Sequence, residues 1–232
     1  MAGETDSGRP MPGAVLARVA SAIGIATEGA ALSIGLAVFG IILIAIGLHS
    51  IGAILVILAI PIALFFRDPD RYPPRTEGVV ICGADGKVTD ISDVSFPGSS
   101  GNPCRRVSVF MSPLNVHVNR APIAGEVTTV EHTAGEFRAA FRDDASEHNE
   151  RNLIAMTDAS GRTFGMMQVA GYLARRIVCR IRARDRIQAG QRIGLIMFGS
   201  RVDHFFPLEY RVTVSLGQRV RAGESIIGAI EQ

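Results

Sequence analysis

The chain has 232 residues and a formal net charge of only +2, which is too small by itself to indicate a nucleic-acid-binding protein. Its hydrophobic fraction of 47% is high for a soluble domain, but the excess is concentrated between residues 30 and 66. The three cysteines are widely spaced and form no Cys/His cluster, which argues against a zinc site or a disulfide framework and favours free thiols buried in a reducing compartment.

The N-terminal part of the chain divides into a polar segment and an apolar segment. Residues 1–28 are polar or weakly amphipathic, and we expect them to be disordered or to form a short amphipathic piece. Residues 29–66 consist of two uncharged apolar runs separated by a predicted turn at His49-Ser50. Each run is near the lower length limit for crossing a bilayer, and no polar face appears at helical spacing. The pattern favours a membrane helical hairpin, spanning or re-entrant, over a buried hairpin of a soluble protein.

Arginines surround this hairpin at both of its ends. Because a hairpin returns the chain to the side on which it started, the positive-inside rule assigns both ends to the cytoplasm. We therefore expect the protein at the cell (inner) membrane, with the rest of the chain on the cytoplasmic side. The arginines concerned are Arg9, Arg18, Arg67, Arg71 and Arg75.

The remainder of the sequence predicts a linker followed by a β domain. Three prolines and alternating charges make residues 67–75 a stiff linker. Residues 76–232 show β patterns, and we expect Phe141 to Asn152 to form a charged loop. The predicted strands include 78–82, 88–94, 106–111, 126–130, 153–157, 163–169 and 176–181.

Two internal similarities indicate how these strands are arranged. Residues 83–89 resemble 121–128, and residues 187–196 resemble 220–230 in a hairpin pattern like that of lipoyl and biotinyl carrier domains. The fold class predicted is mainly β: a barrel-sandwich with lipoyl-like hairpin repeats, built from two related halves and preceded by the helical membrane hairpin. A carrier function is disfavoured, because Lys87 is the only lysine and does not lie at a suitable hairpin tip.

Three residues of the β domain could form a catalytic triad. Ser200, in the pair Gly199-Ser200, would be the nucleophile, His117 the base and Asp85 the orienting carboxylate. Each alone has a plain structural explanation: a loop serine, a hydrogen-bonded histidine and a β-turn aspartate. Their spacing in the sequence does not show that they meet.

Five segments occur in an order and spacing that resemble a known family. They are FFRDPDRYPP (65–74), ADGKV (84–88), MSPLNVHVNRAPIAGEV (111–127), SEHNERN (146–152) and FGSRVD (198–203). Together they are similar to the short (archaeal-type, type A) form of the phosphatidylserine decarboxylase proenzyme family.

The resemblance implies a carboxy-lyase that processes itself. Serinolysis at Gly199-Ser200 would give a β chain of residues 1–199 and an α chain of residues 200–232, paired as a heterodimer. Ser200 would become a pyruvoyl group, the self-derived cofactor, which forms a Schiff base with phosphatidylserine and releases CO2 to give phosphatidylethanolamine. The implied partners are phosphatidylserine, the membrane bilayer and the two cleaved chains, with a homo-oligomer also open; no nucleic acid or metal is implied.

Two positions depart from the pattern of the long forms of the family. Arg120 stands where the long forms carry a second histidine, and Arg201 stands where they have threonine after the Gly-Ser pair. With a single histidine in the motif, the proton donor of the decarboxylation is open among His117, water and Arg120.

An arginine-rich segment could contact lipid headgroups. Arg180, Arg182, Arg184 and Arg186 alternate with other residues, which predicts a strand with all four on one face. Such a row could attract anionic headgroups at about 1 kcal/mol per residue, or it could be a charged strand edge that prevents aggregation. Candidate substrate or headgroup contacts are therefore Arg120, Asn119, Arg180 and Arg182.

Two other functions are compatible with these residues. The same triad could serve a membrane-anchored serine hydrolase that does not cut itself. The lipoyl-like hairpins could instead belong to a non-enzymatic adaptor tethered to the membrane. Self-cleavage would distinguish a self-processing decarboxylase from both of these alternatives.

Overall fold

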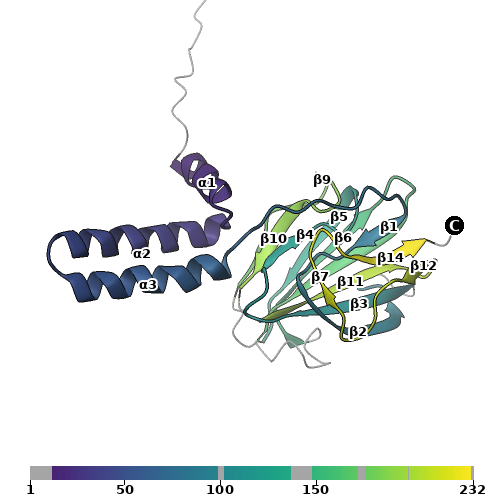
Figure 1. The fold of residues 1–232 in the computed structure, drawn as a ribbon. Coiled ribbons are helices and arrows are strands. Elements are labelled where there is room, and N and C mark those ends of the chain that lie inside the picture. The colour runs from purple at the N-terminus through teal and green to yellow at the C-terminus, as the bar shows by residue number, and fades with distance from the viewer. Residues whose placement is uncertain (1–11, 99–101, 137–147, 172–175, 198, 231–232) are drawn as a thin grey trace, which may run out of the picture. The chain divides into compact units, whose positions relative to one another are not determined.

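The computed structural model describes residues 12–98, 102–136, 148–171, 176–197 and 199–230. It contains two compact units, residues 1–70 and residues 71–232 (Figure 1). The boundary between them falls inside the segment predicted as a linker. Most of the predicted charged loop lies outside the described residues.

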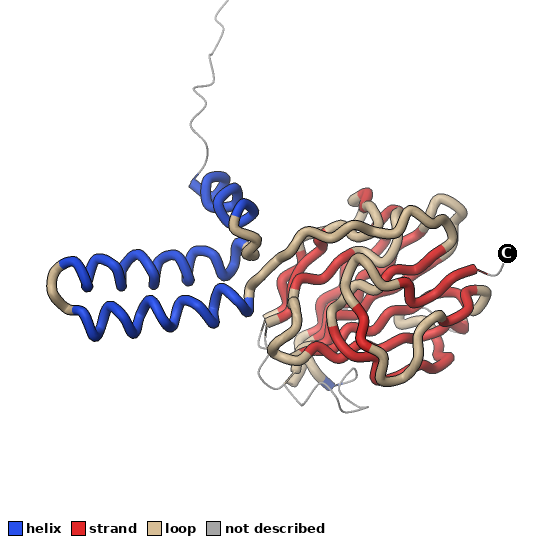
Figure 2. The backbone as a smooth tube through the Cα atoms, viewed as in Figure 1, coloured by secondary structure: helices blue, strands red, loops and turns tan. Residues whose placement is uncertain are grey.

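The first unit is helical. It contains α1 (Pro12–Ala22), α2 (Thr27–Ala45) and α3 (His49–Phe65), and α2 and α3 form a hairpin (Figure 2). The turn between them lies at residues 46–48, where Gly47 has a φ of +91°. The predicted turn at His49-Ser50 was therefore placed slightly too late: the glycine that tolerates positive φ reverses the chain, and His49 already begins α3.

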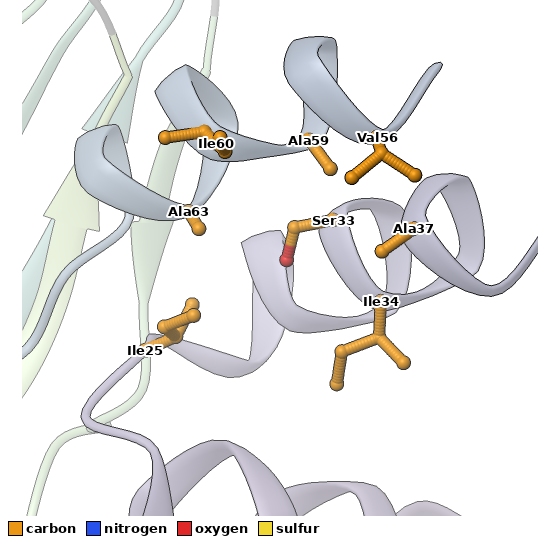
Figure 3. Close-up of a pocket in the computed structure, with 8 residues that line it drawn as sticks. All are labelled: Ile25, Ser33, Ile34, Ala37, Val56, Ala59, Ile60 and Ala63. Atoms are coloured by element: carbon orange, nitrogen blue, oxygen red, sulfur yellow. The ribbon is translucent and has the colours of Figure 1, made fainter. Parts of the chain in front are cut away.

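Small residues allow the two long helices to approach closely. A Cβ placed on Gly40 would lie 2.7 Å from the carbonyl oxygen of Gly52, and one on Gly52 would collide with the carbonyl oxygen of Gly40. Large apolar side chains of both helices point outward and are exposed. A hollow of about 270 Å³ between the helices is lined by apolar side chains and Ser33 (Figure 3). Of the described helices, α2 is long and apolar enough to cross a membrane, and α3 is a shorter apolar helix.

The second unit is a β structure, as predicted. Its strands are β1 (Val79–Ile81), β2 (Gly86–Ser95), β3 (Pro103–Met111), β4 (Val118–Arg120), β5 (Gly125–Thr133), β6 (Arg151–Thr157), β7 (Thr163–Val169), β8 (Ile177–Cys179), β9 (Arg186–Ile187), β10 (Arg192–Ile196), β11 (Ser200–Pro207), β12 (Tyr210–Val212), β13 (Arg219–Val220) and β14 (Ile226–Ile230).

The strand order shows two equivalent halves. The eight-stranded sheet runs β13-β2-β3-β11-β7-β6-β5-β9, and the three-stranded sheets run β1-β14-β12 and β4-β10-β8. Strands β4 to β10 make one half, and they are inserted between β3 and β11 of the other half. The predicted barrel-sandwich of two related halves is confirmed.

Matching hydrogen bonds explain the sequence similarities between the halves. The Gly223 N–H donates to the carbonyl of Cys82, and the Gly190 N–H donates to the carbonyl of Ala121, each at 2.8 Å. Both glycines have a φ of +76°, in hairpin turns that a residue with a Cβ would strain. The repeated Ala-Gly pairs thus encode the same turn twice.

Successive side chains of β11 point alternately to the inner and the outer face of the eight-stranded sheet. Val202 and Phe206 belong to the main core, on the inner face of the eight-stranded sheet. Phe205 belongs to a smaller cluster on the outer face, beside the buried ion pair of Arg201 and Asp203. Ser200 has the parity of the inner face, because side chains of a strand point to alternate sides.

The predicted arginine-lined strand face is wrong. Strand β8 ends at Cys179, and the chain turns at Ala183-Arg184, where Arg184 has a φ of +74°. The turn forms because the Asp185 carboxylate accepts the Arg182 N–H at 2.9 Å. It matches the turn at Gly217 in the other half, since the Arg184 and Gly217 N–H groups bond the equivalent carbonyls of Val127 and Val88. The four arginines are exposed but share no strand face.

The cysteines are free thiols, as expected. Cys82 and Cys104 are buried, whereas Cys179 is only partly so. Burial raises the pKa of Cys82 to about 12, and its thiol donates to the carbonyl of Ala84 at 3.1 Å. Such a thiol stays protonated and unreactive.

Candidate active site

Ser200 is the first residue of β11 and is completely buried. It pairs with Met111 at the end of β3, and its hydroxyl donates to the Met111 sulfur at 3.5 Å. Gly199 has a φ of +62°, a backbone conformation that glycine adopts without steric cost. The Gly199-Ser200 bond therefore joins a residue in the left-handed backbone conformation to the start of a central strand.

His117 ends the connection from β3 to β4 and is 2% exposed. Its carbonyl accepts the Ile196 N–H at 3.3 Å, so this connection runs beside the segment that leads to Ser200. These two connections are the places where the chain passes from one half of the β unit to the other. The two-half topology thus brings His117 and Ser200 to the same end of the sheet.

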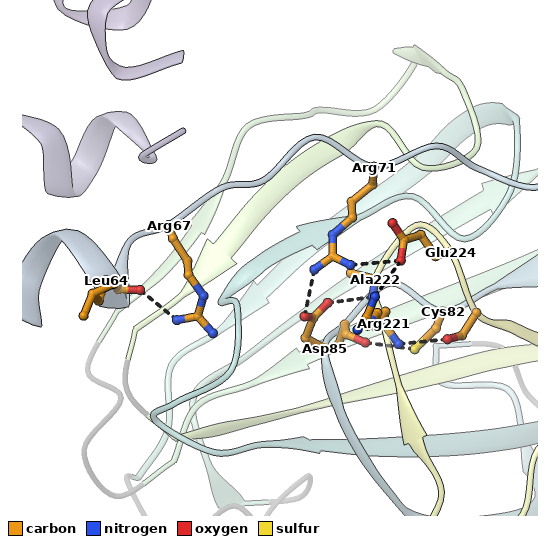
Figure 4. Close-up of polar contacts among 10 residues, drawn as sticks. Leu64, Arg67, Arg71, Cys82, Asp85, Arg221, Ala222 and Glu224 are labelled. Atoms are coloured by element: carbon orange, nitrogen blue, oxygen red, sulfur yellow. Dashed lines mark hydrogen bonds and ion pairs between the residues drawn. The ribbon is translucent and has the colours of Figure 1, made fainter. Parts of the chain in front are cut away.

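Asp85 lies in the turn before β2, at that same end. Lys87 pairs with Phe110, and Phe110 pairs with Arg201, so the start of β2 is level with the start of β11. The Asp85 carboxylate accepts a hydrogen bond from the Arg71 guanidinium at 3.1 Å and another from the Ala222 N–H at 2.7 Å. Both contacts are visible in Figure 4 and fix the orientation of the carboxylate.

Arg71 is a functional candidate that the sequence reasoning missed. It was counted only among the charges that orient the hairpin, yet its side chain is 10% exposed and bridges Asp85 and Glu224 (Figure 4). Its two carboxylate partners lie 14 and 153 residues later in the sequence, beyond the reach of a local pattern. The only signal available was its place in the segment FFRDPDRYPP.

Arg120 is buried between turns of both halves. Its guanidinium donates to the carbonyl of Gly190 at 3.0 Å, and a Cβ on Gly223 would lie 2.8 Å from its Cδ. Arg120 therefore packs against the two equivalent hairpin turns.

A row of buried amides lies near Ser200. Asn152 donates to Gln168, and Gln168 donates to Asn119, each at 2.9 Å. The Asn119 amide in turn lies 3.7 Å from the Met111 sulfur. Sequence reasoning named Asn119 but missed Gln168 and Asn152; the visible signal for Gln168 was a glutamine inside the apolar run FGMMQVA.

His204 connects β11 to the turn that carries Asp85. Its Nε2 accepts the Gly83 N–H at 2.7 Å, and its Nδ1 donates to the carbonyl of Val107 at 3.2 Å. This arrangement requires a neutral ring with the proton on Nδ1. Burial accordingly lowers the pKa of His204 to about 4.

We expect His204 to make the fold sensitive to acid. The unfolded chain binds a proton at the ordinary pKa of 6.5 and the folded chain only near 4, so stability is lost as pH falls through this interval. The loss from this residue is about 3 kcal/mol between neutral pH and pH ~4. Urea unfolding at both pH values should show this extra loss in the wild type compared with His204→Gln. Equal losses in the two proteins would contradict the assignment; His132→Gln, at an exposed histidine, is the control.

The fold and site together define a class of protein. A completely buried serine starts a central strand directly after a glycine in the left-handed conformation, and the connection that ends at the buried His117 runs beside the segment leading to it. This geometry is typical of a β-barrel-sandwich protein that acts on its own backbone, a self-processing proenzyme.

The comparisons with known proteins give the family. The model of the phosphatidylserine decarboxylase family matches residues 58–228. Phosphatidylserine decarboxylase proenzymes of Chlorobium phaeovibrioides, Syntrophus aciditrophicus and Gluconobacter oxydans are 44%, 44% and 46% identical. The matches cover 87%, 71% and 72% of this chain and 91%, 77% and 75% of those relatives. The chain belongs to the phosphatidylserine decarboxylase family.

Proposed function

We propose that this protein is a phosphatidylserine decarboxylase that matures by cutting its own Gly199-Ser200 bond. Members of the family depend on a pyruvoyl group derived from a serine. The observation that carries the assignment to Ser200 is its burial at the start of β11, directly after the left-handed Gly199 and beside the connection that holds His117.

Maturation begins with the serine hydroxyl. His117 takes the proton from the Ser200 Oγ, which attacks the Gly199 carbonyl, while Asp85 orients and stabilises the histidine. The acyl group moves from nitrogen to oxygen and gives an ester. Loss of the α-proton of residue 200 breaks the ester, releases Gly199 as a carboxylate and leaves dehydroalanine. Hydrolysis with loss of ammonia completes the pyruvoyl group.

The interleaved strands support a stable heterodimer of the two chains. The 200–232 chain supplies β11, which lies between β3 and β7, and β14, which lies between β1 and β12. Ala222 and Glu224 of this chain also hold Asp85 and Arg71 of the other. Cutting one bond leaves all these interactions in place.

The buried position of residue 200 suits the group it would carry. Once formed, the pyruvoyl group supplies a carbonyl that condenses with the amine of the substrate and accepts the electron pair released with CO2. His117, which is buried as Ser200 is, delivers the proton to the α-carbon of the product. Asn119 and Arg120 are buried substrate contacts in this proposal, whereas the exposed Arg180 and Arg182 meet the headgroup region.

The helical hairpin accounts for access to a lipid substrate. The exposed apolar side chains of α2 and α3 would lie in the acyl region of the inner membrane. Arginines before and after the hairpin favour a cytoplasmic β unit. A homo-oligomer is compatible with this arrangement.

Intact-mass analysis and a denaturing gel of the purified full-length protein test the proposal. We expect two fragments, one ending at Gly199 and one starting at a residue 200 that lacks a free amine and is lighter by one ammonia than a simple hydrolysis product. The processed protein should release CO2 from vesicles containing phosphatidylserine. An intact single chain that is fully active would overturn self-processing and favour a serine hydrolase.

A further inference from the structure

The buried amides beside Ser200 form a row with a defined order. Asn152, Gln168 and Asn119 are 2%, 0% and 0% exposed, and two hydrogen bonds of 2.9 Å join them. Burying amides costs free energy unless they are bonded, so a satisfied row inside a core holds its members in fixed positions. The row ends at Asn119, whose amide contacts the same Met111 sulfur as the hydroxyl of Ser200, the residue at the proposed cleavage site.

The surroundings of Asn119 fix the direction of the row. Its Nδ2 lies 3.4 Å from the carbonyl oxygen of Gly83 and 3.7 Å from the sulfur of Met111, and both of these atoms only accept hydrogen bonds. Reversing the three amides would turn the Asn119 oxygen toward these two acceptors. The NH2 group of Asn119 must therefore point at them.

This NH2 group is a rigid donor whose identified acceptors are weak. The carbonyl of Gly83 already accepts the Arg120 N–H at the better distance of 2.9 Å, and a thioether is a poor acceptor. The same Met111 sulfur contacts the Ser200 hydroxyl at 3.5 Å. Among the described residues, the preoriented NH2 group of Asn119 and the hydroxyl of Ser200, the proposed nucleophile, thus both contact the Met111 sulfur.

We propose that Asn119 Nδ2 donates a hydrogen bond to the Gly199 carbonyl oxygen as that oxygen becomes negative during self-cleavage; this rests on the proposed function. In the attack, a bond forms between the Ser200 Oγ and the carbonyl carbon, the Oγ proton goes to His117, and the π electron pair moves to the oxygen. When the C–N bond breaks, that pair re-forms the carbonyl and the Ser200 nitrogen takes up a proton. Asn119 is then a catalytic residue, and Gln168 and Asn152 are positioning residues.

Asn119→Asp tests the donor, because it keeps the shape of the side chain and removes the NH2 group. The full-length chain is made in a short pulse of cell-free synthesis, and its splitting is followed on a denaturing gel. We expect splitting to slow by about 100-fold or more. The control is Asn149→Asp, at another completely buried amide, which donates to the carbonyl of Ala170 and should split within about twofold of the wild type. Because a protonated aspartic acid could still donate a hydrogen bond, the rates are compared across pH, and a folded Asn119→Asp chain that splits at the wild-type rate even at alkaline pH would overturn the proposal.

Gln168→Glu tests the positioning without removing Asn119. A protonated glutamic acid can still donate to the Asn119 oxygen, whereas its carboxylate attracts the Asn119 NH2 group and turns it away from Met111. We expect splitting of this variant to slow as pH rises, opposite to the wild type, whose base-assisted attack speeds up. A merely structural role would lower the rate without inverting the pH profile. An uninverted profile in the folded variant would contradict the positioning role.

The wild type separates the two proposals. A wild-type chain that never splits removes self-cleavage and with it the reaction that Asn119 would serve. A wild type that splits, together with an Asn119→Asp variant that splits equally fast, leaves the proposed function intact and removes this inference alone.

Discussion

Ser200→Ala is expected to remain a single uncut chain and to have no decarboxylase activity. The substitution removes the hydroxyl that we propose attacks the Gly199 carbonyl. It also removes the precursor of the pyruvoyl group. Among the described residues, the Ser200 hydroxyl contacts the Met111 sulfur at 3.5 Å, which is a weak interaction, so the fold should keep its stability. A denaturing gel, intact mass and thermal unfolding of wild type and variant measure these outcomes.

Ser108→Ala is the matched control for this experiment. Ser108 is 1% exposed and lies on β3, next to β11, but its partner there is Asp203. We expect this variant to split normally. If Ser200→Ala splits at the same bond as the wild type, Ser200 is not the nucleophile, whatever the activity of the protein.

His117→Ala is expected to slow self-cleavage by about 10²- to 10⁴-fold, the usual contribution of a general base. Asp85→Asn should also slow it, because an amide at this position cannot stabilise a histidine cation. Time courses of chain splitting measure both effects. The control is His132→Ala, at an exposed histidine paired with Glu150.

Asp85→Asn needs a second control, since Asp85 also binds Arg71. Arg71→Ala leaves the carboxylate in place but removes the bridge to Glu224. A much larger loss in Asp85→Asn than in Arg71→Ala would assign the effect to the carboxylate itself. Normal splitting of either His117→Ala or Asp85→Asn would show that the proposed triad is wrong.

Local sequence patterns predicted much of the fold because their causes are local. Uncharged apolar residues favoured the two helices of the hairpin, and alternating residues favoured the strands of the β unit. The repeated Ala-Gly turns at Gly190 and Gly223 indicated two related halves, because only certain residues tolerate their positive φ. The turn at His49-Ser50 was misplaced because Gly47 was overlooked as the residue that reverses the chain.

The arginine-rich segment shows where local patterns fail. Alternation between Arg180 and Arg186 was typical of a strand, but a strand needs a hydrogen-bonded neighbour along its length. Here Asp185 accepts the Arg182 N–H and closes a turn, which is required so that β9 can pair with β5. The pairing of β9 with β5, which is a tertiary contact, therefore decided the local structure against the alternating arginine pattern.

The sequence by itself determined the apolar hairpin, the β class, the repeated halves and the segments that mark the family, because each depends on neighbouring residues or on motifs in order. Only the tertiary structure decided that His117, Asp85 and Ser200 share one end of the sheet, that Arg71 holds Asp85, and that Gln168 and Asn152 align Asn119. Most of these contacts join residues that are distant in sequence. They follow from inserting one half of the β unit between β3 and β11 of the other, so that the two connections between the halves run beside each other, with Met111 opposite Ser200 and His117 bonded to Ile196.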